Sequence, residues 1–296
     1  MTVNAIERCD ELEASLMARL GSIYADALRT ATKKRAAFLR KIKAVDEGQI
    51  KPPQYYIDTD QVDKWRRGFV RELIRQEKVI EGIMEELNKA GAQAADLIRD
   101  TMPEYYAINR EEAVQILSDG FDGSFSKQTR RQVEIILTDS ITPFSRLAYR
   151  NLGRNTAIRR RLEHELSQST ILGESQEKLI KRIMNVTGQA QWQAKRVAQT
   201  ERTRVQSQAR WNAGNEAMTL GVNVINEWSA RMVNTRDTHV ALDGKVALQG
   251  EYFPGSPLRY PGDPTAPAHE VINCHCVMIP DVLRKGQMVV NGKVVG

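Results

Sequence analysis

Two cysteines and three of the four histidines fall between residues 239 and 276. Cys274 and Cys276 are separated only by His275. In an extended segment, side chains two residues apart point the same way, so both sulfurs would face one bound ion. Thiolate sulfur and imidazole nitrogen are ligands that zinc accepts, and four of them form a closed structural site. These residues therefore predict a structural Zn²⁺ site made of His239, Cys274, Cys276 and His275, with His269 and Asp243 as other candidates for the fourth position.

Two other interpretations of the same residues stay open. Cys274 and Cys276 could pack as small buried apolar side chains, with His239 hydrogen-bonded to the backbone. Alternatively, His239 and the nearby acids could act as acid and base, or Cys274 as a nucleophile. The motifs of zinc proteases, P-loops, dinucleotide sites and zinc deaminases are absent. We therefore expect no catalytic residues, and a metal-dependent nucleic-acid-processing enzyme is the alternative function.

Turn-forming and polar residues surround these positions and are expected to fix the local loops. Glycine reaches positive φ in tight turns and proline locks φ, so Asp243-Gly244 predicts a hairpin turn and Tyr260–Pro264 a rigid turn. Arg236 is expected to pair with Asp237 or Asp243 in a buried ion pair. The predicted structural residues are Arg236, Asp237, Asp243, Gly244, Pro261, Gly262, Asp263 and Asn273.

The elements that position this region are predicted to be mostly helices. Met102-Pro103 should end one of them, Asp60 should cap its beginning, and Gly221 should follow the last. Apolar residues recur at helical spacing over 3–46, 60–98, 110–118, 128–137, 144–152, 156–166, 175–186 and 189–220.

Beyond Gly221 the pattern alternates, and proline and glycine become frequent. Strands are predicted at 222–230 and 271–279, with a terminal hairpin over 288–295 around Asn291-Gly292. The expected fold class is α+β and mostly helical, with long N-terminal helices, a helical middle segment and a small C-terminal module. The expected divisions are a helical N-terminal arm (1–125), a basic helical segment (126–190) and an α+β module (191–296).

The positive charge is concentrated in the middle of the chain. The whole chain carries +6, whereas residues 141–225 contain 14 Lys or Arg and 6 Asp or Glu, a local balance of +8. Such an excess favours contact with phosphate backbones, although a solvated helix face gives the same pattern. The predicted DNA-binding residues are Arg159, Arg160, Arg161, Lys181, Arg182, Lys195 and Arg196.

Membrane and secretory signals are missing from the sequence. No run approaches the roughly 18 apolar residues of a membrane span, and the first residues lack an apolar stretch. The three cysteines do not form a disulfide framework. We therefore expect a protein that works inside a cell, or in a particle assembled there, without contact with a membrane.

An ordered series of motifs resembles the phage head morphogenesis family, the Mu F-like minor head proteins of tailed phages. The series runs over about residues 140–282. The residue between the two cysteines departs from the family, which usually has arginine where this chain has His275. The motifs are Thr200-Glu201-Arg202-Thr203, Arg236-Asp237-Thr238-His239, Leu242-Asp243-Gly244, Tyr260-Pro261-Gly262-Asp263 and Glu270 through Cys276.

The resemblance implies a minor capsid protein in multiple copies within the virion, assembled in the host cytoplasm. The implied place is the capsid interior near the portal vertex. The implied partners are the portal protein, the major capsid or scaffold protein, and packaged double-stranded DNA. Such proteins are not principally enzymes. An interaction scaffold without a role in DNA contact is the remaining alternative.

Overall fold

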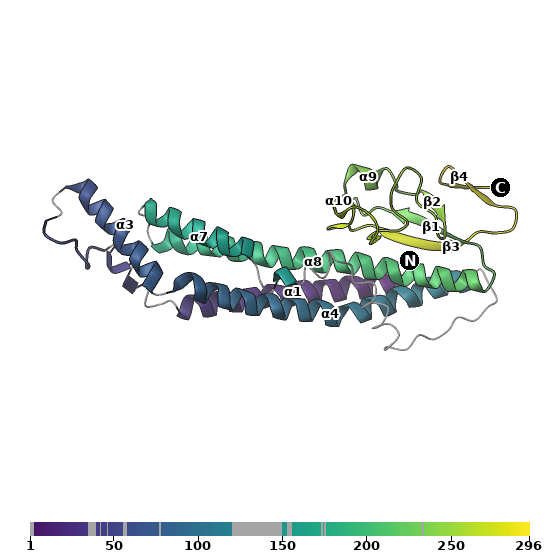
Figure 1. Ribbon diagram of the computed structural model, residues 1–296. Coiled ribbons are helices and arrows are strands. Elements are labelled where there is room, and N and C mark those ends of the chain that lie inside the picture. The colour runs from purple at the N-terminus through teal and green to yellow at the C-terminus, as the bar shows by residue number, and fades with distance from the viewer. Residues whose placement is uncertain are drawn as a thin grey trace. The chain divides into compact units, whose positions relative to one another are not determined.

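A computed structural model describes residues 3–34, 40–41, 43–45, 47–55, 58–76, 78–119, 150–152, 156–172, 174, 176–232 and 234–296. Long helices precede a small sheet in these residues, so the expected mostly helical α+β class is confirmed (Figure 1). None of the described helices combines the length and apolar content that crossing a membrane requires. The long helices are α1 (Val3–Lys34), α3 (Thr59–Gln76), α4 (Val79–Asp119), α7 (Thr156–Ile171) and α8 (Gln176–Thr219).

The sheet is antiparallel, with β1 (Val224–Ser229) in the middle of the order β2-β1-β3. β2 is Val246–Leu248 and β3 is Val277–Val282. Trp228 stands opposite Met278 in the register of β1 and β3, and both side chains are fully buried. The short helices α9 (Asp237–Val240) and α10 (Ala268–Val271) lie in the connections between strands.

The predicted terminal hairpin is present. β4 (Met288–Val290) pairs with β5 (Lys293–Val295) in an antiparallel register. Asn291 and Gly292 between them have φ values of 48° and 78°. Two successive residues with positive φ are the requirement of the tight turn that matches strand twist, which is why asparagine followed by glycine predicted it.

The chain divides into two compact units. Unit 1 takes residues 1–17, 97–148 and 195–296, and unit 2 takes 18–96 and 149–194, in each case as far as they are described. Each long helix α1, α4 and α8 contributes residues to both. The sequence-based division at residues 125 and 190 stays a prediction.

A buried arginine joins three elements of unit 1. The Arg210 side chain on α8 is 1% exposed and donates to Asn109 Oδ1 and, at 2.6 Å, to Glu112 Oε2, both on α4. A further donation reaches the Met278 carbonyl of β3 at 2.7 Å. Burial lowers the pKa of Arg210, and the charge of Glu112 opposes that shift. The guanidinium therefore ties the sheet and α4 to α8.

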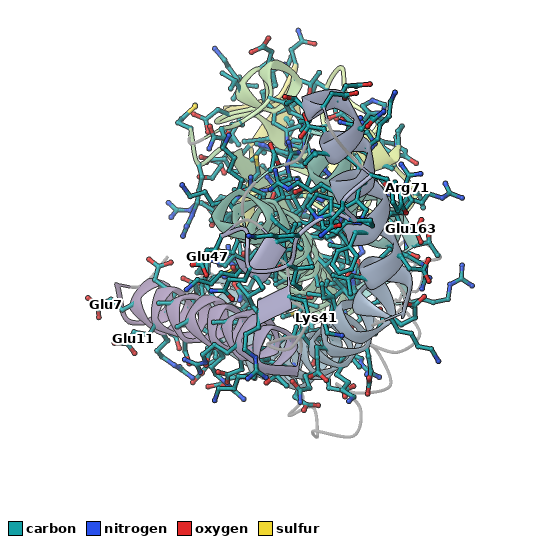
Figure 2. All side chains as sticks on the ribbon, turned by 90° about the vertical axis from the view of Figure 1, so that its left-hand side faces the viewer. Glu7, Glu11, Lys41, Glu47, Arg71 and Glu163 are labelled. Carbon is teal, nitrogen blue, oxygen red and sulfur yellow. The ribbon has the colours of Figure 1, made fainter. Side chains whose placement is uncertain are left out.

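Unit 2 buries leucines on α7 and α8. Leu162, Leu166 and Leu179 are at most 2% exposed. Charged residues on the outer faces point to solvent, as Figure 2 shows for Arg71 of α3. This separation of apolar and charged faces is what the three- to four-residue spacing predicted.

Three helix predictions were wrong in detail. Pro103 does not end a helix, because α4 runs through it to Asp119 with the neighbouring Met102 and Tyr105 buried. The packing of these side chains outweighs the hydrogen bond that proline removes. Asp58, rather than Asp60, caps α3, since Asp58 Oδ1 accepts the Gln61 N–H at 2.8 Å. The helices predicted at 175–186 and 189–220 are one continuous helix, α8.

The end of α8 follows the prediction for Gly221. This glycine has φ of 86°, and its N–H donates to the Met218 carbonyl. The Val222 N–H donates to the Ala217 carbonyl, and the two side chains pack in one apolar cluster. This pair of bonds is the Schellman arrangement that turns the chain out of a helix and into β1. The segments predicted as helices at 128–137 and 144–149 lie outside the described residues.

Candidate metal centre

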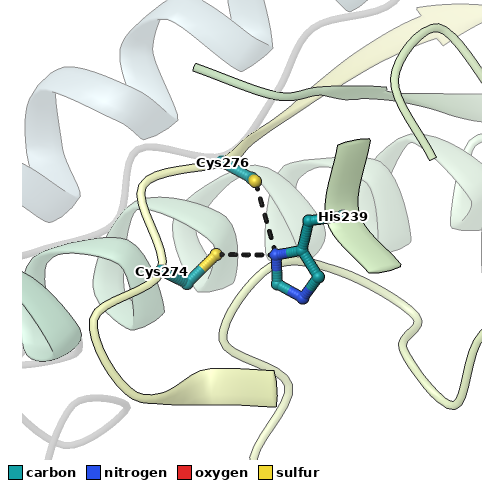
Figure 3. A group of neighbouring side chains, drawn as sticks. All are labelled: His239, Cys274 and Cys276. Atoms are coloured by element: carbon teal, nitrogen blue, oxygen red, sulfur yellow. Dashed lines mark hydrogen bonds between the residues drawn. The ribbon is translucent and has the colours of Figure 1, made fainter. Parts of the chain in front are cut away.

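Three of the four predicted ligands meet in the core of the C-terminal sheet region. Nδ1 of His239 lies 3.5 Å from Sγ of Cys274 and 3.5 Å from Sγ of Cys276 (Figure 3). The three ligand atoms lie within 4.8 Å of one another, and the side chains are 1–2% exposed. A tetrahedral zinc ion with ordinary bond lengths gives an N···S edge of about 3.6 Å. The group could therefore hold a metal ion, although an S–H···N hydrogen bond has a similar length.

Local backbone structure brings the sulfurs to one side. The predicted strand at 271–279 begins only at Val277; α10 ends at Val271 and a turn follows. Asn273 has φ of 56°, a value that asparagine tolerates better than most residues. The extended residues 274–276 then alternate, so the two cysteines face His239 on α9.

His275 does not join this group. It is half-buried, and burial together with the charge of Arg202 lowers its pKa, while Glu13 acts in the opposite direction. These neighbours belong to α8 and α1. The alternation that brings Cys274 and Cys276 together directs the residue between them to the other side.

The pKa values of the two thiols are shifted in opposite directions. Hydrogen bonding from Cys274, helped by His239, lowers the pKa of Cys276 to about 5 against the effect of burial. The same contact with Cys276, together with burial, raises the pKa of Cys274. One thiolate is thus favoured at neutral pH, and the thiolate is the form that binds metals.

Three side chains of helix α8 hold the cysteine loop, residues 272–276, in place. Gln199 Nε2 and Thr203 Oγ1 both donate to the Cys274 carbonyl, and the Asn273 N–H donates to Thr200 Oγ1 at 3.0 Å. Thr200 and Thr203 belong to a motif of the sequence, but their contacts with the loop could not be predicted because the three residues precede it by more than 70 positions. Their spacing of three or four on a helix is the one signal that they share a face.

Arg236 and Asp243 hold neighbouring backbone segments. The guanidinium of Arg236 donates to the carbonyls of Glu270 and Ile272, at 2.6 and 2.7 Å. Asp243 Oδ1 accepts the Ala230 N–H at 2.7 Å. Gly244 has φ of 71° as expected, but it does not close a tight hairpin, since residues 230–245 connect β1 to β2. Asp237 begins α9.

The Tyr260–Pro264 turn is pinned against α8. Gly262 has φ of 79°, and a Cβ there would lie 3.0 Å from the Arg204 Cα, so glycine is required twice over. Asp263 is fully buried and accepts from Arg259 at 2.9 and 3.0 Å and from Thr265. Burial works against its charge, but these hydrogen bonds outweigh it and hold the pKa of Asp263 below its ordinary value.

Comparison with known proteins gives this region a family. The model of the family described as Phage Mu protein F like protein matches residues 160–279. Residues 160–279 are thus similar to the Mu F-like family. The matched segment contains all three side chains of the His–Cys–Cys group, and it confirms the resemblance drawn from the motifs.

Two curated relatives extend the comparison. "Uncharacterized protein YqbB" of Bacillus subtilis is 25% identical over 243 residues, which cover 75% of this chain and 78% of the relative. The "NAD(+)--arginine ADP-ribosyltransferase EFV" of Enterococcus faecalis is 34% identical over 110 residues, 36% of this chain but 22% of that protein. No solved structure matches the chain.

The predicted DNA-binding residues differ in their surroundings. Arg182 is held by Glu165 and Glu174, at 2.5 and 2.6 Å. Arg159 pairs with Glu81 and Glu163. The side chains of Arg160, Arg161, Lys181 and Arg196 are exposed, and Lys195 is half-buried.

Proposed function

We propose that this protein is a minor head protein of a tailed phage that sits at the portal vertex or the capsid interior and contacts packaged DNA. The observation that carries the proposal is the Mu F-like segment at 160–279. That family supports a role in head morphogenesis and a location in the virion. The portal, the major capsid protein and the scaffold are the partners to test.

Co-expression with the neighbouring head proteins tests the assembly role. We expect the chain to co-purify with the portal ring and to enter assembled heads in several copies. The long helices of both units offer extended surfaces for such docking. A chain that neither binds portal, capsid or scaffold nor enters heads would contradict the proposal.

DNA contact predicts a defined salt dependence. The triple variant Arg160→Ala, Arg161→Ala, Lys181→Ala removes three exposed cations of the basic segment. Each phosphate contact contributes about 0.9 to the slope of log affinity against log salt, so a loss of up to about 2.7 is expected. Fluorescence anisotropy with duplex DNA measures this slope.

A matched triple variant controls for net charge. Arg284, Lys285 and Lys293 are also exposed but lie outside the basic segment. Their replacement by alanine should leave the salt slope nearly unchanged. Equal slopes for both triple variants, or an affinity that does not vary with salt, would favour the scaffold without DNA contact.

We infer that His239, Cys274 and Cys276 supply three ligands to a Zn²⁺ ion in a structural role, with the fourth ligand outside this group. The fit of both N···S distances to a zinc tetrahedron and the lowered pKa of Cys276 support it. Burial of all three side chains keeps a nucleic-acid substrate away from the group, which argues against the catalytic alternative.

Elemental analysis of protein purified without a histidine tag tests the zinc site. We expect about one equivalent of zinc, because a structural site binds tightly at neutral pH. A content below about a tenth of an equivalent would leave the cysteines as packed apolar side chains.

Incubation with DNA, RNA and divalent metals should give no cleavage. Cleavage that is abolished by His239→Ala would favour the enzyme.

A further inference from the structure

The two ring nitrogens of His239 face different partners. Nδ1 is directed at the two cysteine sulfurs, whereas Nε2 lies 2.9 Å from Oε2 of Glu270. The nitrogens leave the ring in widely different directions. An ion bound through Nδ1 therefore leaves the Glu270 carboxylate outside the coordination shell. Glu270 occupies the place where carboxylates orient a ligating imidazole.

Glu270 is itself held in position. Its side chain is 9% exposed, and Oε2 accepts the Thr238 hydroxyl at 3.0 Å. The Glu270 backbone carbonyl accepts from Arg236. The exposed His269 ring lies 3.6 Å from the other carboxylate oxygen. Both the backbone and the side chain of Glu270 are therefore held in place, so its carboxylate can fix the orientation of the His239 ring.

The distance to Glu270 selects one tautomer of His239. The contact is close but bent, since Nε2 makes no hydrogen bond of good geometry. A neutral imidazole carries its proton on one nitrogen, and an ionised carboxylate only accepts. A lone pair on Nε2 would lie 2.9 Å from the carboxylate oxygen and be repelled by it, whereas an N–H group in the same place is attracted. The proton is therefore favoured on Nε2, and Nδ1 keeps the lone pair that a metal needs.

We propose that Glu270 is a positioning residue of the metal centre, holding His239 in the Nε2–H tautomer so that Nδ1 coordinates zinc. The inference rests on the zinc site proposed above and deepens it. Thr238 supports Glu270 in this role. Neither residue is a ligand, so both should affect how tightly zinc binds while the number of sites stays the same.

Zinc affinity measured by competition with a chromophoric chelator tests this role. Loss of an outer-shell partner costs roughly 10–100-fold in metal affinity, so Glu270→Ala should weaken binding by that factor. Glu270→Gln should lose less, because its amide oxygen can still accept the Thr238 hydroxyl and lie beside the Nε2–H group. Glu251 is an exposed carboxylate of the same region, and Glu251→Gln should stay within about twofold of the wild type.

Nitrogen-15 NMR of the histidine rings reports which ring nitrogen is protonated. This tautomer would not depend on Glu270 if that residue only contributed to folding. We expect zinc-bound His239 to show a protonated Nε2 and a coordinated Nδ1. Coordination through Nε2, or Glu270→Ala that stays folded and binds zinc as tightly as the wild type, overturns the proposal. A wild type that takes up no zinc overturns it together with the zinc site. Portal and DNA binding are measured separately, so failure of the head function is distinguishable.

Discussion

Arg210→Ala is expected to lower the free energy of unfolding by about 3–5 kcal/mol, because it leaves the buried Glu112 carboxylate without its cation. The same change removes donors from Asn109 and from the Met278 carbonyl. Since these partners lie on α4 and β3, the loss should reach the whole of unit 1. Urea denaturation followed by tryptophan fluorescence and circular dichroism measures it.

A double-mutant cycle separates the ion pair from lost packing. Glu112→Ala should also be costly, while the double variant should fall well short of the sum, because neither charge is then buried alone. Lys181→Ala replaces an exposed cation of the same helix and should change stability by no more than about 0.5 kcal/mol. Additive effects of the two buried residues would show that their charges are not coupled.

The features that the sequence predicted well are those set by neighbouring residues. Gly221 ends α8 and Asn291-Gly292 closes the hairpin because their requirement is a local φ value. The three- to four-residue spacing of apolar residues indicated the long helices, because this spacing is also a local feature of the chain. Pro103 misled because its local cost is outweighed by the packing of α4, which no neighbouring residue reveals.

The prediction of the metal group was limited in the same way, because local patterns do not reveal contacts between distant residues. Residue types and the two-residue spacing were enough to predict that Cys274 and Cys276 lie together with His239. The same alternation directs His275 to the other side, away from this group. The supporting residues could not be inferred in this way. Thr200 and Thr203 reach the cysteine loop across more than 70 residues, and Glu270 meets His239 only after α9 and α10 have folded beside one another.

Cys274→Ser is expected to remove bound zinc and to destabilise the sheet region. The reason is thermodynamic linkage, since an ion that binds only the folded state adds its binding free energy to stability. At free zinc about a thousandfold above the dissociation constant, this contribution is about 4 kcal/mol. Hydrogen exchange should show faster opening of β1, β2 and β3, while the helices of unit 2 keep their protection. Zinc content and exchange rates are measured on the same sample.

Cys9 offers a matched control. It is also buried, and its sulfur lies 3.5 Å from Asn109 Nδ2 on α4, away from the His–Cys–Cys group. Cys9→Ser introduces the same polar atom into a buried site but should retain zinc. A chelator should then destabilise wild type and Cys9→Ser alike, and should leave Cys274→Ser unchanged. If the two cysteines only pack, the chelator has no effect on any of the three proteins, and Cys274→Ala is tolerated better than Cys274→Ser because alanine suits the surrounding core of Trp228, Leu242 and Phe253.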